Sequence, residues 1–371
     1  MNKYNISSWD AKERMNLIME KVHIGLIGCG SISDSHLQAY AANPQVKLVA
    51  VCDLNPERAR QTASKYEIPG IYDDYKELLA DPNIHAVSIC TWNNSHAEIS
   101  IAALHAGKHV LCEKPLCKTV DEALAVQKAV EETGLILQVG YVRRHAANIE
   151  VLKRFIDAGD LGELYYAKAS LIRRLGNPGG WFADVERSGG GPLIDIGVHV
   201  IDLCWYLMGK PKVVSVSGNT YRKLGNRSNV ENYAYYQAAD FDPSVNTVED
   251  MANALIRFEN GASLAVDVSF SLHARKESAQ VAVFGERGGA EIEPALAIAT
   301  ERHNTILNVD PQLTTPGFDF VDSFKREINH FVQLCRSEAE NLCPVEDGVE
   351  MIRILNAIYQ SAAEGREIRL D

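Results

Sequence analysis

The residues best suited to chemistry in this chain are a lysine after one apolar run and an aspartate–histidine pair after a run of glycines. Lys114 lies just after the apolar run His109–Cys112, and a lysine at a strand end can stabilise a developing oxyanion. Asp195 and His199 follow Pro192, which can begin a helix, and their i, i+4 spacing would place them side by side on it. The pattern predicts a proton acceptor, His199, beside a carboxylate and within reach of a cation.

Each of these residues also has a purely structural interpretation. Lys114 could be a surface lysine in a loop, Asp195 an acid at a helix N-terminus, and His199 a hydrogen-bonded core histidine. Asp202 continues the same helix face and is either structural or a partner that orients His199. The glycines at 189–191 either let the backbone approach a cofactor or substrate, or form a flexible turn.

A glycine-rich turn, GCGSIS at 28–33, follows the apolar run Val22–Ile27 and could hold a phosphate group. Gly28 permits a tight turn, Gly30 lets backbone amides approach a pyrophosphate, and the N-terminus of the next helix adds N–H donors. Ser33 stands at the third glycine position of the G-x-G-x-x-G pattern, and similar turns occur for structural reasons alone. A strand before the turn and a helix after it predict the start of a dinucleotide-binding unit.

The residue that ends the second predicted strand indicates which dinucleotide is bound. Asp53 would accept hydrogen bonds from the adenosine ribose hydroxyls and repel a 2′-phosphate, which favours NAD over NADP. Alternatively, Asp53 caps the helix that starts at Asn55–Pro56, and the nearby Arg58 leaves NADP open. The residues at 91–93 follow another predicted strand, where ligands of open α/β sheets bind.

Strand and helix patterns alternate from Val22 to about Tyr141, which predicts a doubly wound parallel sheet. The predicted strands after the first are Lys47–Cys52, His85–Cys90, His109–Cys112 and Ile136–Val139. The predicted helices are Ser35–Ala42, Pro56–Tyr66, Asp74–Ala80, Ser95–Ala106 and Val120–Thr133. We expect an α/β fold with a Rossmann dinucleotide-binding domain over residues 21–142, preceded by an N-terminal extension over residues 1–20.

Beyond Tyr141 strands follow strands, which predicts an α+β domain rich in antiparallel pairs over residues 143–371. Alternation is clearest over Ser263–Phe270, where every second residue is apolar. The other predicted strands are Leu164–Ile172, Val213–Val216, Ala254–Phe258 and Val281–Phe284. The predicted helices are Ala147–Ala158, an amphipathic Pro192–Met208, Phe320–Cys335 and Val345–Glu364. The polar stretch 218–250 predicts a long loop that covers a site or a subunit contact.

The composition argues against several classes of partner. The chain has 371 residues, 37 of them basic and 49 acidic, and a net charge of −12 disfavours nucleic acid and anionic membrane surfaces. No apolar run is long enough to span a membrane, and the first residues lack the apolar core of a secretory signal. The eight cysteines form no C-x-x-C pair and no zinc-type grouping, so we expect no metal site and reduced thiols in a cytoplasmic protein.

Taken in order, these elements resemble the Gfo/Idh/MocA family, named for glucose–fructose oxidoreductase, inositol dehydrogenase and rhizopine catabolism. The resemblance covers nearly everything from Val22 to the C-terminus and is carried by EKP at 113–115 and GGGPLIDIGVH at 189–199. The other matching positions are the turn 28–33, His36, Asp53, Thr91, Trp92, Asn93, His96, the run 106–112 and Trp181. The chain departs from the family at Trp92, commonly a proline, and at His145, usually an aromatic residue.

The resemblance implies that the second domain has a large, open-faced, mostly antiparallel sheet that often forms an oligomer interface, so we expect a homo-oligomer, either a dimer or a tetramer. It implies hydride transfer between NAD(P) and a secondary hydroxyl of a sugar, cyclitol or sugar derivative. Lys114 and His199 are then the catalytic pair, and Asp195 binds the substrate or belongs to a proton network. Tyr141 and Arg144 match positions that line the substrate site.

The expected cofactor is NAD, with NADP not excluded, and the residues expected to contact it are Gly28, Gly30, Ser31, Ile32, Asp53, Thr91, Trp92, Asn93, His96, Glu113, Lys114 and Trp181. The residues expected to contact the substrate are Lys114, Tyr141, Arg144, Asp195 and His199. Two other functions stay open. A redox-neutral glycosidase or epimerase would oxidise the sugar transiently and accumulate no NADH, and a catalytically silent NAD or sugar sensor would not need the whole set of Lys114, Asp195 and His199.

Overall fold

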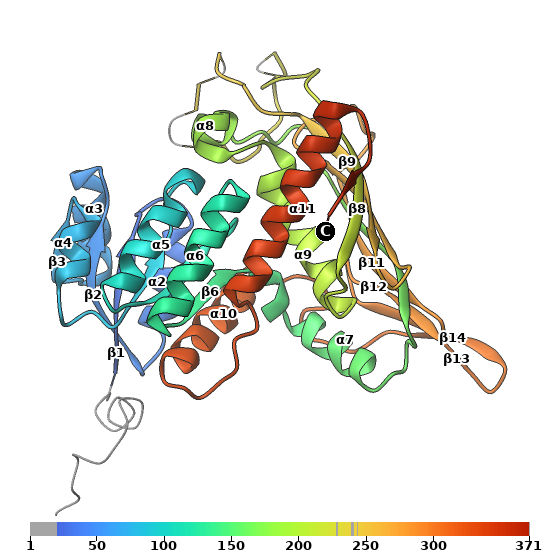
Figure 1. Ribbon diagram of the computed structural model, residues 1–371, viewed down its shortest axis with the longest axis horizontal. Coiled ribbons are helices and arrows are strands. Elements are labelled where there is room, and N and C mark those ends of the chain that lie inside the picture. Colours follow the sequence, from blue (N-terminus) through green and yellow to red (C-terminus); the bar gives the residue numbers. More distant parts are fainter. Residues whose placement is uncertain (1–20, 228, 239–240, 243, 371) are drawn as a thin grey trace, which may run out of the picture.

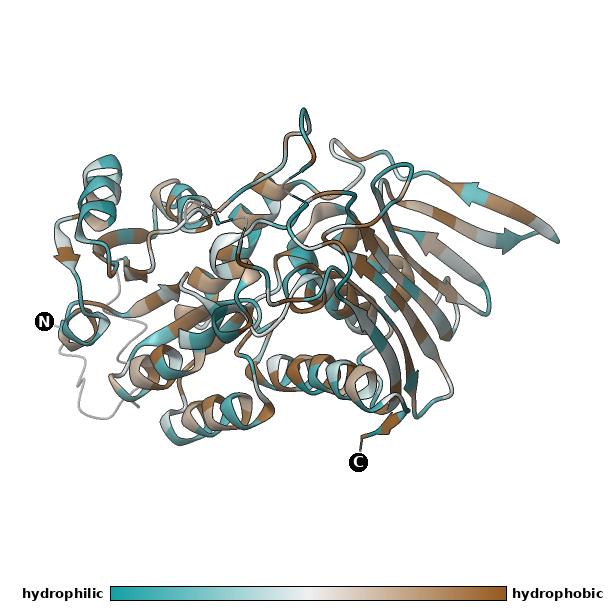
Figure 2. Cartoon of the chain, turned by 90° about the horizontal axis from the view of Figure 1, so that it is seen from above, coloured by the Kyte–Doolittle hydropathy of each residue, from teal (hydrophilic) through white to brown (hydrophobic). Residues whose placement is uncertain are grey.

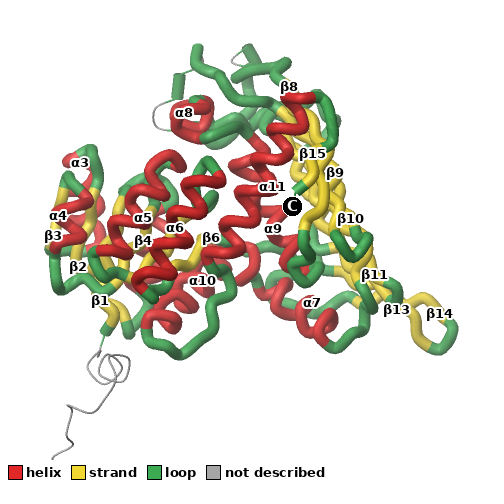
Figure 3. Tube along the Cα trace, viewed as in Figure 1, coloured by secondary structure: helices red, strands yellow, loops and turns green. Residues whose placement is uncertain are grey.

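The computed structural model describes residues 21–370 apart from 228, 239, 240 and 243, so the predicted extension over residues 1–20 lies outside the described residues. Two β-sheets stand side by side, each with helices packed against it (Figure 1, Figure 3). The first sheet is formed by the N-terminal part of the chain and the second by the remainder.

In the described residues the first sheet has six parallel strands in the order β3-β2-β1-β4-β5-β6. The strands are β1 (Val22–Ile27), β2 (Val46–Cys52), β3 (Gly70–Tyr72), β4 (Ala86–Ile89), β5 (His109–Glu113) and β6 (Leu137–Gly140). Strands β4, β5 and β6 are buried along their whole length, as expected of a sheet covered on both faces. The order reverses between β1 and β4, and at such a switch point the carboxyl ends of the strands leave a crevice for a ligand. The predicted doubly wound sheet is confirmed, and the short edge strand β3 was not predicted.

Three of the five helices described in this part begin at a side-chain cap that the sequence shows. The five helices are α2 (Ser33–Ala41), α3 (Pro56–Tyr66), α4 (Tyr75–Ala80), α5 (His96–His105) and α6 (Val120–Thr133). The Asn55 side chain caps α3 by accepting hydrogen bonds from two backbone N–H groups of its first turn. A capping box of Thr119 and Glu122 begins α6, and Gly134 ends it in the left-handed conformation. These helices confirm the five predicted ones.

The second sheet has nine strands within the described residues, in the order β14-β13-β12-β11-β7-β10-β9-β8-β15. Only β7 and β10 pair in parallel, so the sheet is mostly antiparallel, as predicted. The strands are β7 (Leu164–Ile172), β8 (Val213–Tyr221), β9 (Met251–Phe258), β10 (Ser263–Ser269), β11 (Ser278–Gly285), β12 (Gly288–Glu291), β13 (Ala297–Arg302), β14 (Thr305–Val309) and β15 (Ile368–Arg369). Strands β12 to β15 were not predicted, because two glycines, exposed polar residues and shortness hide their alternation.

The remaining helices are α7 (Ala147–Asp157), α8 (Val185–Ser188), α9 (Val198–Leu207), α10 (Phe320–Cys335) and α11 (Val345–Glu364). The prediction of one amphipathic α-helix over Pro192–Met208 was wrong in two respects. A π-helical turn, Leu193–Gly197, precedes α9, and α9 itself is buried nearly all round. A helix that is apolar on every side belongs to the interior rather than to a surface.

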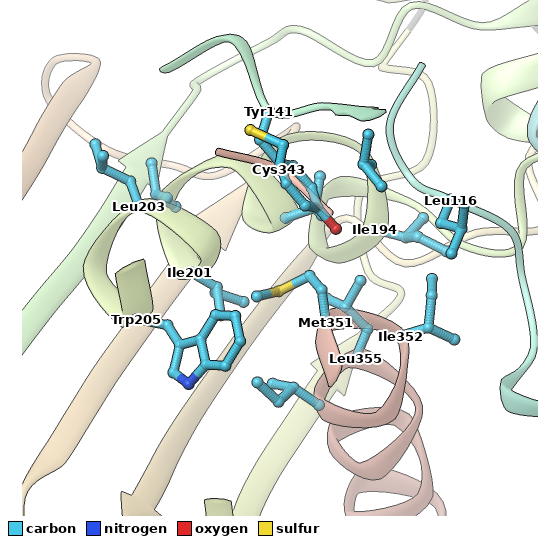
Figure 4. Packing of buried hydrophobic residues seen from close by; sticks show 14 of the residues in the cluster. Leu116, Tyr141, Ile194, Ile201, Leu203, Trp205, Cys343, Met351, Ile352 and Leu355 are labelled. Atoms are coloured by element: carbon cyan, nitrogen blue, oxygen red, sulfur yellow. The ribbon is translucent and has the colours of Figure 1, made fainter. Parts of the chain in front are cut away.

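Two closing helices join the two sheets into one body. Helix α10 packs on α2, and its Phe331 shares a buried cluster with Ile24 and Tyr40 of the first sheet and its helix. Helix α11 packs on α6 and on β8, and Figure 4 shows its Met351 and Leu355 among core residues of the second domain. The range 143–371 therefore supplies part of the cover of the first sheet, which the predicted division into two domains did not include.

The second sheet is covered by helices on one face only (Figure 2). Its opposite face presents half-buried apolar side chains such as Tyr166, Leu255 and Phe284, with the rings of Tyr166 and Phe284 stacked at 5.6 Å. The expected open face is therefore present. In the part of the chain that the structure describes, no helix combines the length and apolar character needed to cross a membrane.

Candidate active site

Lys114 lies directly after β5, and its side chain reaches the second domain. Its Nζ donates hydrogen bonds to Oδ1 and to the backbone carbonyl oxygen of Asp195, both at 2.9 Å. The two side chains are 16% and 14% exposed, so solvent screens this ion pair only in part. An ammonium group has three donors, and the two contacts to Asp195 leave the third available for a ligand. Lys114 and Asp195, which are 81 positions apart in the sequence, thus meet across the domains.

Asp195 lies in the π-helical turn Leu193–Gly197, immediately before the α-helix that carries His199. Such turns are rare and frequently occur at functional sites, because they displace side chains from regular α-helical positions. Glu249 fixes the start of this turn: its carboxylate accepts hydrogen bonds from the N–H groups of Gly191 at 2.9 Å and Leu193 at 3.1 Å. The segment that carries Asp195 and His199 is therefore held by a buried carboxylate from a distant loop.

The glycines that precede this turn have a role that neither sequence-based interpretation anticipated. A Cβ at Gly191 would lie 2.4 Å from the carbonyl oxygen of Glu249, and one at Gly190 would lie 2.0 Å from the Tyr359 hydroxyl. Tyr359 in turn donates a hydrogen bond to Glu249 at 2.9 Å. These glycines therefore let Glu249 and Tyr359 approach the backbone closely, a contact within the protein itself.

His199 is half-buried and makes no hydrogen bond with the described residues, while its Nδ1 is enclosed without a partner. Burial lowers the pKa of His199 well below its usual value, and the positive charges of Lys114, Arg143 and Arg173 lower it further. The imidazole is therefore neutral at physiological pH. A neutral imidazole beside a lysine ammonium is suited to accept a proton from a hydroxyl group.

The glycine turn has the shape that a dinucleotide diphosphate requires. Gly28 has a φ of +93°, and a Cβ there would lie 2.5 Å from the Cys90 carbonyl oxygen, so only glycine fits. At Gly30 a Cβ would meet no atom within 4 Å, which leaves open space beside the backbone. Helix α2 begins after Ile32 with no side-chain cap, and because the Ser33 and Ser35 N–H groups donate to the Gly30 and Ile32 carbonyl oxygens, an anion would be bound by the remaining N–H groups of this turn. The turn therefore fits the diphosphate of the predicted cofactor.

Ser33 and Asp53 have contacts that clarify their roles. The Ser33 hydroxyl donates to the Gly30 carbonyl oxygen at 2.6 Å, so the residue at the third glycine position stabilises the turn. Asp53 Oδ2 accepts from the Cys29 N–H at 2.8 Å, and Arg58 lies 3.7 Å from the same oxygen. Asn55 is the N-cap residue of α3, and Asp53 Oδ1 accepts from the Asn55 N–H at 2.7 Å, so Asp53 also supports the start of this helix. Asp53 lies beside the turn, where a ribose hydroxyl could reach it.

Three predicted cofactor residues use their side chains within the protein. His96 is buried, with Nδ1 2.7 Å from the Pro115 carbonyl oxygen and Nε2 3.1 Å from that of Thr91, and burial lowers its pKa. Asn93 donates to the Ser188 carbonyl oxygen at 2.7 Å. The buried Glu113 carboxylate lies 2.8 Å from His36 Nε2, with which it forms an ion pair when His36 is protonated, and accepts from the Lys114 N–H at 3.1 Å. These side chains fix the ends of β4 and β5.

The other predicted cofactor residues lie around the crevice. Ser31 is exposed at the turn, and Ile32 packs partly into the core beside it. The Thr91 hydroxyl accepts a hydrogen bond from Ser95 at 2.8 Å, and Trp92 is 38% exposed. Trp181 is half-buried, and its ring lies 3.9 Å from that of Phe182.

Comparison with known proteins matches both parts of the chain to one family. Residues 22–141 match the model of an oxidoreductase family with an NAD-binding Rossmann fold, and residues 153–370 match the model of that family's C-terminal alpha/beta domain. The chain belongs to the Gfo/Idh/MocA family. It is therefore an enzyme, an NAD(P)-dependent dehydrogenase.

Named relatives of the family align along almost the entire chain. D-glucoside 3-dehydrogenase of Escherichia coli (strain K12) is 32% identical over 352 residues, which cover 94% of this chain and 97% of that one. scyllo-Inositol 2-dehydrogenase (NAD(+)) of Bacillus subtilis (strain 168) is 30% identical over 365 residues, covering 95% and 97%. A solved structure of levoglucosan dehydrogenase in complex with NADH superimposes with a TM-score of 0.83 at 25% identity, covering 95% of this chain and 99% of that one.

Two Gfo/Idh/MocA positions that were expected to line the substrate site lie in the core instead. Tyr141 is 1% exposed, and its hydroxyl is buried without a partner (Figure 4). The Arg144 guanidinium is fully buried and forms ion pairs with Asp202 and Asp347. It also donates to the Leu342 carbonyl oxygen at 2.7 Å. Both side chains are therefore enclosed by the protein in this structure, and Asp202 contacts Arg144.

Arg143, which precedes Arg144 in the sequence, is the one of the two whose charge acts on the site. Arg143 is paired with Glu293 at 2.6 Å, and its guanidinium lies 4.4 Å above the Phe318 ring. Its charge and that of Arg173 act on His199. Neither Arg143 nor Glu249 was predicted from the sequence. Motif positions do not show which of two adjacent arginines lies near the site and which is buried in the core.

The described residues contain no group of three or more metal-binding side chains, and all eight cysteines are buried free thiols.

Replacing Arg144 by Met should lower the free energy of unfolding by about 3–5 kcal/mol, because the carboxylates of Asp202 and Asp347 would lose their buried partner. Urea unfolding followed by circular dichroism measures the change. Arg154→Met is the control: its exposed pair with Glu150 contributes no more than about 1 kcal/mol. A stable Arg144→Met variant with a raised KM for its substrate would restore Arg144 to the substrate site.

Proposed function

We propose that this chain oxidises a secondary hydroxyl group of a sugar, glycoside or cyclitol with NAD, using His199 as the proton acceptor. The observation that carries the proposal is the neutral, half-buried His199 beside a lysine that is anchored by Asp195. These groups lie at the carboxyl edge of the first sheet, where its glycine turn opens. The names of the relatives, which include a glucoside, a levoglucosan and two inositol dehydrogenases, support this substrate class.

Each residue of the site has a separate task in this proposal. His199 takes the proton of the hydroxyl group, because its depressed pKa keeps a lone pair available. Lys114 directs its third N–H donor at the same oxygen and stabilises the negative charge that develops there. Asp195 holds the ammonium group in position through two hydrogen bonds. Bound NAD supplies the hydride acceptor.

The cofactor preference follows from the residues at the end of β2. The Asp53 carboxylate would repel a 2′-phosphate and accept hydrogen bonds from the ribose of NAD. Arg58 is 43% exposed and lies beside Asp53, so NADP is retained as a second cofactor to test. Gly28, Gly30, Ser31 and the remaining N–H groups of the turn would hold the diphosphate.

We also propose that residues 143–371 form the substrate-binding and oligomerisation domain and that the enzyme is a cytoplasmic homo-oligomer. The uncovered, partly apolar face of the second sheet supports an interface between copies. The eight free cysteines support a reducing compartment. Light scattering on the purified protein gives the number of subunits.

A screen of sugars, glycosides, cyclitols and sugar acids by NADH absorbance, with NADP in parallel, should find at least one substrate that reduces NAD. One NADH should accumulate for each product molecule, because the proposed enzyme releases its reduced cofactor. Product without stoichiometric NADH would instead identify a redox-neutral enzyme, and binding without turnover would identify a sensor.

Replacing His199 by Ala should slow sugar oxidation by about 10²–10⁴-fold, the usual effect of losing a general base. The affinity for NADH, followed by the change in its fluorescence, should stay at the wild-type value. His105→Ala, at an exposed histidine of α5, is the control and should leave both quantities unchanged. Near-normal turnover of His199→Ala would exclude this residue as the base.

The rate of oxidation should stay high as the pH falls through 6.5 and decline only below it, because His199 stays neutral there. Removing a neighbouring positive charge favours the protonated imidazole, so Arg173→Met should move the acidic limb of the kcat/KM profile to higher pH. Arg154→Met, at an exposed arginine of α7, should leave the limb in place. An acidic limb above pH 6.5 in the wild type would contradict the depressed pKa.

A further inference from the structure

A tyrosine of the second domain reaches the glycine turn of the first. Tyr236 lies in the long loop between β8 and β9, and its hydroxyl is 3.0 Å from the Ser31 Oγ. The two residues are 205 positions apart. Ser31 belongs to the turn that fits the cofactor diphosphate, so this loop places a second hydroxyl group at the mouth of the cofactor crevice.

The position of Tyr236 is supported on both sides along the chain. The Asp250 carboxylate holds the first part of the loop by accepting three backbone N–H groups over residues 223–225. Just after Tyr236, the Ala238 N–H donates to the Pro178 carbonyl oxygen at 2.8 Å. The Tyr236 ring meets the Phe182 ring edge-on at 6.5 Å, and Phe182 packs against Trp181.

The segment against which Tyr236 packs also borders the cofactor crevice. Ser188 accepts a hydrogen bond from Asn93 through its carbonyl oxygen, and the Arg187 guanidinium lies 4.6 Å above the Trp92 ring. Helix α8 consequently lies against the residues that follow β4. Tyr236 contacts the turn after β1, and this segment contacts the residues after β4, the two strands that flank the switch point, so residues of the second domain lie at both strand ends.

We propose that Tyr236 is a cofactor-binding residue whose hydroxyl donates a hydrogen bond to the diphosphate of NAD. The Tyr236 and Ser31 hydroxyls have two O–H donors, and the contact between them uses only one. The second donor is free for a phosphate oxygen while the contact between the residues persists. Tyr236 is 53% exposed, so the ring needs no rearrangement of the core to turn toward a ligand. The proposal rests on the use of NAD but not on sugar oxidation.

The test compares Tyr236→Phe with Tyr233→Phe in the full-length, nucleotide-free protein. Tyr233 lies in the same loop, but its hydroxyl donates to Glu277 at 3.1 Å, away from the glycine turn. NADH is titrated by fluorescence, and ADP-ribose and adenosine by calorimetry. Tyr236→Phe should raise the Kd for NADH and ADP-ribose roughly tenfold, as expected for a lost hydrogen bond to a charged group. The Kd for adenosine, which has no phosphate, should not change.

Two results would overturn the proposal. The first is wild-type affinity of Tyr236→Phe for NADH and ADP-ribose. The second is an equal loss in Tyr233→Phe, which would assign the effect to the loop as a whole. Since both readouts are binding constants, either result is distinct from failure of the dehydrogenase proposal, which would appear as an absence of turnover in an enzyme that binds NADH.

Discussion

The structure depends on an ion pair that crosses its two halves, between Lys114 at the end of β5 and Asp195 in the π-helical turn. Neither sheet alone places a cation and a proton acceptor together. The first sheet positions Lys114 and the second domain positions Asp195. The backbone before each of these residues is itself held by further hydrogen bonds. Glu113 and His36 position the backbone before Lys114, while Glu249 and Tyr359 position the backbone before Asp195.

Local patterns were sufficient for most of the fold. The alternation of apolar runs with capped helices predicted the parallel sheet and its helices, since such signals involve neighbours in sequence. Alternation failed for β12 to β14, where side chains on both faces are partly exposed and the apolar pattern is weak. The prediction also failed before α9, because the largely apolar run 192–208 predicts the same helix whether or not its first turn is π-helical.

Among the site residues, those that lie in motifs were predicted and those that support them were not. Lys114, Asp195 and His199 have recognisable spacing, whereas Glu249 lies in a polar loop whose sequence has no period. The adjacent Arg143 and Arg144 separate for a tertiary reason. Arg144 is held in the core by ion pairs with two buried carboxylates, Asp202 and Asp347, whereas Arg143 lies near the site. Ion pairs between residues so far apart in the chain cannot be recognised from a single sequence.

Helix α10 has a consequence for how the chain becomes folded. Its Phe331 completes the apolar cluster around Ile24 and Tyr40, yet the strands of the second sheet from β7 to β14 lie between them in the chain. The first sheet consequently exposes part of its apolar core while the second sheet is being synthesised. The apolar core of the first sheet is thus complete only after the strands β7 to β14 of the other sheet have been synthesised.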